Sequence, residues 1–190
     1  LCLQFLRMIK IKSFLLLLGA IVISGGTLIG QNISGVVNSY ARVTAIAGNS
    51  FTVDNLSGDI NDFEPGSKVL IIQMKGADID RSNGSTYGDI LALNEAGNYE
   101  YAIVKEISGS SPFIITVYNT PKSYNPAAFV QIISVPQYDD VTVSGELTAL
   151  PWNRINGTGG VLAMDVSGTL SLAANINVSG KEGKGQRFSL

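Results

Sequence analysis

From Val36 onward, short runs of β-prone residues alternate with turn-forming residues at intervals of about 8 to 15 positions, and this rhythm restricts the possible folds more than any single motif. Helical periodicity is not sustained anywhere in this part of the chain. One run, residues 69–72 (Val-Leu-Ile-Ile), is apolar throughout, which is typical of a fully buried strand. The pattern therefore predicts an all-β protein.

The predicted strands follow one another between these turns. They cover residues 40–47, 50–54, 68–74, 89–93, 99–107, 113–118 and 129–135. Gly48 and Asn49 predict a hairpin turn because both residues accept positive φ. Pro121, Pro126 and Pro136 fall in connections, where a missing N–H costs no hydrogen bond of a sheet. We predict a small β-barrel of about five to seven strands over residues 31–137, with a single β-sandwich as the alternative.

A recurring pentapeptide marks the part of the chain after the predicted barrel. It reads Val-Thr-Val-Ser-Gly at 141–145, Met-Asp-Val-Ser-Gly at 164–168 and Ile-Asn-Val-Ser-Gly at 176–180. Apolar first and third positions place two side chains on one strand face, and the near two-to-one spacing is typical of stacked parallel turns. We predict the beginning of a parallel β-solenoid over residues 138–180, followed by an irregular tail at 181–190. The alternative is a set of three ordinary hairpin strands.

The N-terminus resembles a secretion signal. A short segment with Lys10 and Lys12 precedes the uncharged run 14–23, and small residues follow it. We expect a signal peptide over residues 1–30, with cleavage after Gly30 or Gly26 and with residues 1–7 as an over-extended start. The protein is then secreted or on the cell surface, without a membrane span once the signal is removed. The alternative is an uncleaved anchor, because the apolar character approaches the length that spans a bilayer.

Composition excludes several classes of chemistry. The chain has no His, and its single Cys is Cys2, ahead of the apolar run. Disulfides, thiolate nucleophiles, Ser-His-Asp triads and zinc or iron sites with His or Cys ligands are therefore excluded for the mature chain. Residues 31–190 hold 10 basic and 15 acidic residues, with no basic stripe that would bind a phosphate backbone. A nucleic-acid partner is not expected.

Four segments carry a resemblance to a known group of proteins. They are Lys-Val-Leu-Ile-Ile-Gln-Met-Lys-Gly-Ala at 68–77, Val-Pro-Gln-Tyr at 135–138, Gly-Gly-Val-Leu-Ala at 159–163 and Ser-Gly-Thr-Leu at 167–170. Residues 36–180 resemble the N-terminal region of large secreted, multidomain surface proteins of the Bacteroidetes, which are adhesin-like or associated with gliding motility. The resemblance implies a non-catalytic structural or adhesive N-terminal module. Residues 181–190 depart from the continuation usual in that group, so we expect a truncated or frameshifted reading frame.

The loop 78–89 is a candidate calcium site. Asp78, Asp80 and Asp89 supply oxygen ligands at positions 1, 3 and 12 of a twelve-residue window. The loop departs from the EF-hand pattern, because Gly84 stands at position 7, Asp89 replaces Glu at position 12, and strands flank it. Ca²⁺ is therefore a candidate cofactor, with a solvated loop as the alternative and no other cofactor expected.

Tyr138 and Trp152 are candidate rings for sugar stacking, and their alternative role is to cap a barrel core. Asp139, Asp140 and Glu146 do not predict a glycosidase pair, because adjacent strand residues point to opposite faces. We therefore expect no enzyme. The expected function is a structural or adhesive module that contacts extracellular surfaces and self-associates through an open solenoid end. A carbohydrate-binding module is the first alternative, and the opening segment of a β-helical polysaccharide-active enzyme is the second.

Overall fold

The computed structural model describes residues 30–183, so the predicted signal, apart from Gly30, and residues 184–190 of the tail lie outside the described part of the chain. Within residues 30–183 the fold is all-β, as predicted. The helical elements of this part are two 3-10 turns, η1 (Ile60–Phe63) and η2 (Pro126–Ala128). Among these residues, no helix is long and apolar enough to cross a membrane.

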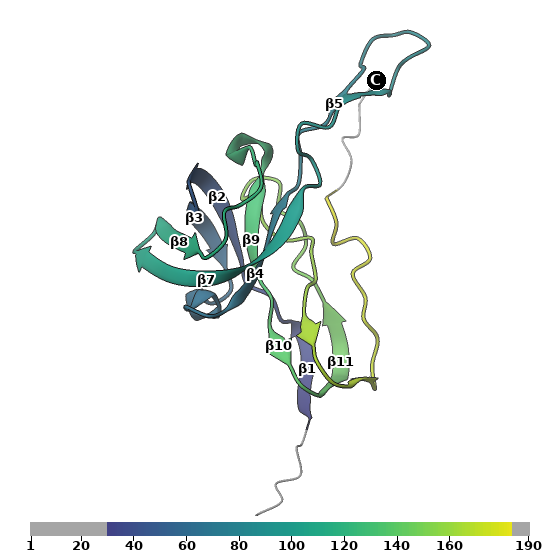
Figure 1. Ribbon diagram of the computed structural model, residues 1–190. Helices are drawn as coiled ribbons and strands as arrows, with labels where there is room; N and C mark the ends of the chain where they lie inside the picture. The colour runs from purple at the N-terminus through teal and green to yellow at the C-terminus, as the bar shows by residue number, and fades with distance from the viewer. Residues whose placement is uncertain (1–29, 184–190) are drawn as a thin grey trace, which may run out of the picture.

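Six antiparallel strands close into a barrel in the order β2-β3-β8-β7-β4-β9 (Figure 1). They are β2 (Tyr40–Ala47), β3 (Ser50–Ser57), β4 (Lys68–Gln73), β7 (Tyr99–Gly109), β8 (Phe113–Val117) and β9 (Val130–Ser134). The predicted barrel is confirmed. The alternative of a single β-sandwich is wrong, because β2 pairs with β9 as well as with β3 and so leaves this sheet no free edge.

The barrel interior is filled by alternate residues of the six strands. Val43, Phe51, Ile71 and Ile115 are fully buried there, and Phe63 of η1 joins them from outside the sheet. The hairpin from β2 to β3 turns at Gly48, whose φ of +60° is the left-handed conformation that the sequence indicated for this position. The core therefore follows from the period-two alternation of apolar residues along each strand.

β4 is buried on both of its faces, as its unbroken apolar run indicates. Val69 and Ile71 point into the barrel core. Leu70 points outward and packs with Tyr40 and Ile133 in a second cluster, between the barrel and the rest of the chain. This outer cluster explains why β4 does not alternate between apolar and polar residues.

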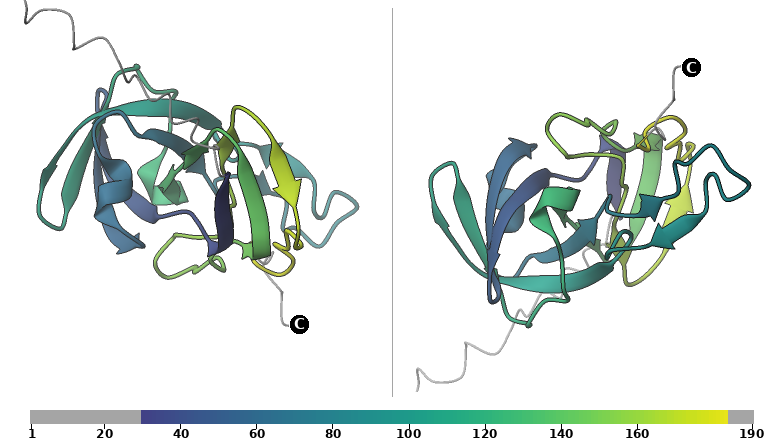
Figure 2. Two further views of the ribbon diagram at one scale, coloured as in Figure 1. Left: turned by 90° about the horizontal axis from the view of Figure 1, so that it is seen from below. Right: turned by 90° about the horizontal axis from the view of Figure 1, so that it is seen from above.

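The other strands form a parallel unit beside the barrel (Figure 2). It consists of β1 (Gln31–Val36), β10 (Gln137–Tyr138), β11 (Val141–Thr148), β12 (Asp165–Val166) and β13 (Leu170–Leu172). β1, β11 and β13 pair in parallel in that order, and β10 pairs in parallel with β12. The sequence-based boundary grouped residues 31–36 with the barrel, whereas β1 pairs with β11.

Two layers of this unit repeat with a constant offset. We call residues 137–148 the first layer and residues 165–176 the second layer. Paired residues are Gln137 with Asp165, Val141 with Leu170 and Leu147 with Ile176. Each residue of the second layer therefore follows its partner by 28 or 29 residues.

The pentapeptide repeat does not define this register. Residues 141–143 pair with 170–172 rather than with 164–168, and residues 165–166 pair with 137–138. The register follows the apolar residues, because Val141 and Val143 are directly opposite Leu170 and Leu172. The prediction that the three pentapeptides stack on one another is therefore wrong in its register, although the strands are parallel.

Buried side chains join the barrel to the segment 149–163, which connects the two layers. The Asn38 side-chain amide donates to the carbonyl of Ser134 at 2.7 Å and accepts from the Ala163 N–H at 3.2 Å. The Gln131 amide exchanges two hydrogen bonds with Gly159, each of 3.0 Å. Because these polar groups are buried and paired, they fix how the parallel unit sits on the barrel.

A hairpin arm projects from the barrel end. Its strands are β5 (Asp78–Ile79) and β6 (Ile90–Ala92), which pair only with each other (Figure 1). The predicted strand at 89–93 is therefore present, but it lies in this arm and not in the barrel.

Candidate functional site

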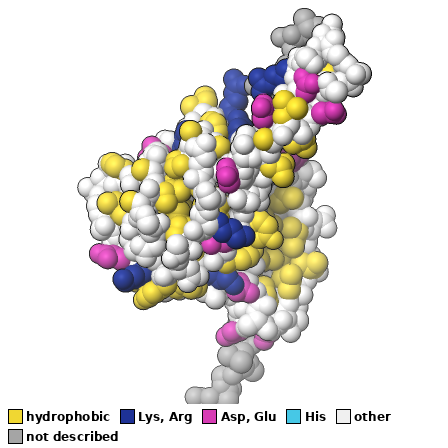
Figure 3. All heavy atoms as spheres, turned by 45° about the horizontal axis from the view of Figure 1, so that its top comes forward, with side chains coloured by type: hydrophobic (Ala, Val, Ile, Leu, Met, Phe, Trp, Pro, Cys, Tyr) yellow, Lys and Arg dark blue, Asp and Glu magenta, His cyan; other side chains and the backbone are white. Residues whose placement is uncertain are grey.

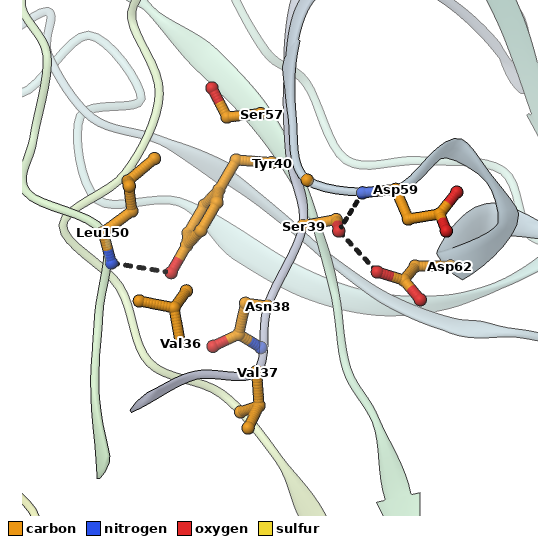
Figure 4. Close-up of a pocket in the computed structure, with 10 residues that line it drawn as sticks. Val36, Val37, Asn38, Ser39, Tyr40, Ser57, Asp59, Asp62 and Leu150 are labelled. Atoms are coloured by element: carbon orange, nitrogen blue, oxygen red, sulfur yellow. Dashed lines mark hydrogen bonds between the residues drawn. The ribbon is translucent and has the colours of Figure 1, made fainter. Parts of the chain in front are cut away.

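A hollow of about 360 Å³ lies where the barrel meets the parallel unit (Figure 4). The residues that line it are Val36, Val37, Asn38, Ser39, Tyr40, Ser57, Gly58, Asp59, Asp62 and Leu150. It combines two carboxylates with hydroxyl groups, which are side chains that can take part in acid–base chemistry.

The polar groups of this hollow already have partners. The Ser39 hydroxyl donates to the Asp62 carboxylate and accepts from the Asp59 N–H at 2.8 Å. The Asp59 carboxylate accepts from the Asn61 N–H at 2.9 Å and caps η1. A side chain at Gly58 would collide with Ser39, since its Cβ would lie 2.1 Å from the Ser39 hydroxyl oxygen. The group therefore anchors β2 to the loop that follows β3.

The tyrosines near this hollow are held in their neutral form. The Tyr40 hydroxyl donates to the Val161 carbonyl at 2.7 Å, and burial raises its pKa although the Leu150 N–H opposes the shift. Burial, and then the negative charge of Asp62, raise the pKa of Tyr138. Neither phenol is suited to act as a base near neutral pH, and the hollow offers no activated nucleophile among the residues that line it.

The calcium candidate loop forms the tip of the arm. Asp80 uses both carboxylate oxygens within the loop: Oδ1 accepts from the Ser82 N–H at 2.7 Å and Oδ2 from the Thr86 hydroxyl at 2.6 Å. These hydrogen bonds lower its pKa. Asp78, Asp80 and Asp89 are not brought together, since no group of three or more such side chains that could hold a metal occurs within residues 30–183.

The two candidate sugar-stacking rings lie in different places. Tyr138 is partly buried and packs in the apolar cluster of the parallel unit. Trp152 meets Phe129 edge to face, with ring centroids 6.1 Å apart, and a Cβ added at Gly183 would lie 3.3 Å from the Trp152 ring. Both residues are partly buried, so only part of each ring is open to solvent.

Asp139 and Asp140 join the two layers instead of forming a catalytic pair. Asp139 accepts from the Ser167 hydroxyl at 2.8 Å, and Asp140 accepts from the Thr169 N–H at 2.7 Å. Both carboxylates thus hold the turn after β12 against the turn before β11. The two carboxylates therefore meet the same turn, residues 167–169, where each already has a hydrogen-bond partner.

The open side of the second layer is the most distinctive surface of the described chain. In the first layer Val141, Val143 and Leu147 are almost fully buried, at 1%, 0% and 0% exposure. Their partners in the second layer, Leu170, Leu172 and Ile176, are 39%, 63% and 39% exposed. A hollow of about 510 Å³ lies along residues 172–177 on this side. The interior side chains of the second layer therefore lack the cover that the first layer has.

Three tyrosines that the sequence did not single out as a group share the barrel surface. Tyr99 and Tyr101 point outward from β7, and Tyr118 follows β8; they are 56%, 50% and 64% exposed. The Tyr118 N–H donates to the carbonyl of Ile103 at 3.1 Å, which places it beside β7. Alternation of Tyr99, Tyr101 and Ile103 along one strand is the sequence signal that identifies this face.

Comparison with known proteins adds no identity. No model of a known protein family matches the chain, and no curated protein matches it significantly.

Proposed function

We propose that this chain is a non-catalytic structural module that caps one end of a parallel β-solenoid. The observation that carries the proposal is the contrast between the two layers. The same interior positions are buried in the first layer, where a second layer covers them, and exposed in the second layer. Stacked turns of a solenoid bury their apolar face only against the next turn.

The direction of the parallel unit supports the capping role. From the barrel, the strands follow in the order β1, β11 and β13, so the layers grow away from the barrel in both views of Figure 2. The chain passes from β1 directly into the barrel strand β2, so the barrel is attached at the β1 end of the stack. The Thr169 carbonyl accepts a hydrogen bond from the Val141 N–H of β11, and the Ala173 N–H donates to the Val143 carbonyl. Because successive residues of a strand direct their backbone groups to opposite sides, those of Leu170 and Leu172 point away from β11, toward the open side. A further parallel strand can pair there.

Location and partners are proposals that rest on the sequence. The basic segment and apolar run at residues 8–23 support export, and the resemblance of residues 36–180 supports a cell-surface protein of the adhesin-like type. In such a protein the barrel end is a rigid support, and the solenoid carries the surfaces that meet other cells or glycans. The N-terminal segment of a β-helical enzyme would have the same architecture. Asp139 and Asp140 do not favour that alternative, because both carboxylates are hydrogen-bonded between the layers.

The capping role is tested by adding a layer to the full chain. A copy of residues 165–183 is joined after Leu190 through a short linker that places the copied Leu170 29 residues after the original, as in the natural offset. We expect slower hydrogen exchange at Leu172 and a higher Tm, with about 2 to 4 °C for each kcal/mol gained. The matched control carries Ser at the copied positions of Leu170, Leu172 and Ile176.

The comparison between the two extended chains decides the matter. If the apolar extension gives no more protection and no higher Tm than its Ser control, the open side is not a stacking surface. The capping role would then be withdrawn.

A second candidate function is glycan binding. The exposed face with Tyr99, Tyr101 and Tyr118 is a better candidate surface for it than Tyr138 and Trp152, which are partly buried. Tyr99 and Tyr101 are two residues apart on one strand face, which sets their Cα atoms about 7 Å apart. Phenol rings presented in this way can stack on sugar faces while their hydroxyl groups form hydrogen bonds. This function is compatible with the capping role, because the face lies on the barrel.

Glycan binding predicts a specific result on a glycan array. We expect the double change Tyr99→Ala with Tyr101→Ala to abolish binding, since both rings would be lost from one face. Tyr87→Ala, an equally exposed tyrosine at 56%, is the control on the arm. Binding that survives the double change but is lost with Trp152→Ala would favour the original candidate ring.

A further inference from the structure

Two aromatic side chains at one end of the barrel each contact positively charged groups. The Arg42 guanidinium carbon lies 4.6 Å from the Phe129 ring centroid, and the Lys75 ammonium lies 4.5 Å from it. The Lys122 ammonium lies 5.9 Å from the Tyr99 ring centroid and donates to the Tyr99 carbonyl at 3.0 Å. Because these distances are within the range of cation–π contacts, the two rings help to hold the three positive charges in place.

The two rings flank the end of β4. The Gln73 N–H donates to the Asn98 carbonyl at 3.0 Å, and the Met74 N–H donates to the Phe129 carbonyl at 2.9 Å. Tyr99 follows Asn98 directly and is the first residue of β7. Neighbouring strands are about 4.8 Å apart, so the backbones of Tyr99 and Phe129 are on the order of 10 Å apart, one on each side of β4. The two cation–aromatic groups are therefore neighbours.

Both groups lie on the outer side of the barrel. Ala41 and Val43 belong to the barrel core, so Arg42 between them points outward, and the Phe129 ring that it contacts lies outside the core as well. Tyr99 is 56% exposed. Figure 3 shows a group of Lys and Arg side chains between the barrel and the arm. A ligand outside the barrel can therefore reach the rings and the cations together.

The three cations have no acidic partner in the described part of the chain. None of Arg42, Lys75 and Lys122 forms an ion pair there. The Glu100 carboxylate accepts from the Lys122 backbone N–H at 2.7 Å, and Glu100 lies on the face of β7 opposite to the exposed tyrosines. Lys75 and Lys122 are both exposed. Because like charges repel one another, an anion bound at this surface is stabilised by all three groups.

We propose that this surface binds an acidic polysaccharide, with sugar rings against Tyr99 and the open part of Phe129, and with carboxylate or sulfate groups paired with the three cations. This inference rests on the glycan-binding function proposed above and names its ligand class. An acidic sugar combines an apolar ring face, which stacks on an aromatic side chain, with an anionic group that an ammonium or a guanidinium binds. An acidic peptide supplies the charges without the ring faces, and a neutral polysaccharide supplies the ring faces without the charges.

Binding of the full chain to three forms of one polymer tests the ligand class. Dextran is neutral, whereas carboxymethyl-dextran and dextran sulfate carry carboxylate and sulfate groups on the same backbone. We expect one or both charged forms to bind about tenfold more tightly than dextran, and this binding to weaken as the salt concentration rises, because salt screens exposed charges. The charged form that binds more tightly identifies the anionic group.

Matched variants test the position of the site. Lys75→Gln with Lys122→Gln should weaken binding of the charged forms about tenfold, because two charge-assisted contacts are lost. Lys75→Arg with Lys122→Arg keeps both charges and should keep the binding. The control, Arg81→Gln with Lys105→Gln, removes the same charge from the arm and from a position about 20 Å along β7 from Tyr99. All four side chains are exposed, and thermal melts should show that every variant is folded.

The outcomes separate the acidic ligand from the glycan-binding function. Equal binding of dextran and its charged forms, unchanged in the Lys75→Gln, Lys122→Gln chain, would overturn the acidic ligand and leave glycan binding in place. An equal loss of binding in the control chain would indicate attraction by net charge alone and would overturn the site.

Two further results would also contradict the inference. Poly-L-glutamate that binds as tightly as carboxymethyl-dextran would assign the surface to an acidic peptide and would overturn the polysaccharide. No binding of the charged polymers, together with no binding of acidic glycans on the array, would overturn the acidic ligand. An array on which no glycan binds at all would overturn the glycan-binding function as well.

Discussion

At the scale of single residues, close approach between the two layers depends on Gly168. A Cβ at this position would lie 2.5 Å from the Asp140 carboxylate and 2.7 Å from the Asp139 carbonyl oxygen. The glycine of the Ser-Gly pair at 167–168 is therefore required locally, because any side chain at position 168 would push the two layers apart. The same turn carries the hydrogen bonds from Ser167 and Thr169.

Gly168→Ala should therefore destabilise the protein. We expect a loss of about 1 to 3 kcal/mol, as for other overpacked sites, measured by denaturant unfolding. Gly84→Ala is the matched control, because a Cβ at Gly84 meets only the Ser82 hydroxyl at 3.5 Å. Equal stability of the two variants would contradict the tight contact between the layers.

The hydrogen bonds of the Asp80 carboxylate predict that pH affects the order of the loop at the arm tip. The Thr86 hydroxyl, then Ser82, lower its pKa in the folded loop. A lowered pKa means that the carboxylate orders the loop above the ordinary Asp pKa, and that this order is lost as the pH falls through the folded pKa. NMR titration should give Asp80 a pKa below its ordinary value, and Thr86→Val should raise it. A pKa that does not respond to Thr86→Val would contradict this role.

At the scale of elements, β13 is one of the two edge strands of the sheet β1-β11-β13. Its inner neighbour β11 is paired on both sides, with β1 and with β13, whereas β13 has one strand neighbour. Uncovered edges with apolar side chains promote pairing between chains, and a lysine on the edge prevents it.

Leu172→Lys should accordingly reduce self-association. Light scattering during size-exclusion chromatography at rising concentration should show oligomers of the unchanged chain and fewer or none of this variant. Ile155→Lys provides the control, because Ile155 is 79% exposed but lies in the connecting segment. A chain that stays monomeric at all concentrations would show that the edge does not pair in trans.

At the scale of the whole molecule, the barrel and the parallel unit are held together by buried groups. Tyr40, Leu70 and Ile133 form an apolar cluster with Val135 and Ala163 between them. The ion pair between Lys68 and Asp165 at 2.6 Å adds a link from β4 to β12, although its exposure keeps its contribution small. The two parts should therefore unfold together.

Asn38→Ala tests this coupling. The buried Asn38 amide bonds to both Ser134 and Ala163, so its loss leaves backbone groups unpaired and should cost about 1 to 3 kcal/mol. Trp152, the single tryptophan, reports the connecting segment, and far-UV circular dichroism reports all strands. Melts by the two probes should coincide in the unchanged chain and separate in Asn38→Ala. Separate melts in the unchanged chain would contradict the coupling.

The local parts of this fold could be predicted from residues that are neighbours along the chain. The β2–β3 hairpin follows from Gly48 and Asn49 between two β-prone runs, and burial of β4 follows from its unbroken apolar run, because both signals depend on neighbours along the chain. The absence of His and the position of Cys2 likewise exclude whole classes of chemistry without any coordinates.

The tertiary structure decided which distant segments meet. It placed β1 beside β11, more than 100 residues away, and set the register by the apolar ladder of Val141 and Leu170 instead of the pentapeptides. It also showed which neighbours Asp80, Tyr138 and Trp152 contact, which the sequence did not predict. A sequence does not specify which distant strands pair or how elements are oriented in space. The open side of β13 and the orientation of the arm are therefore known only from the tertiary structure.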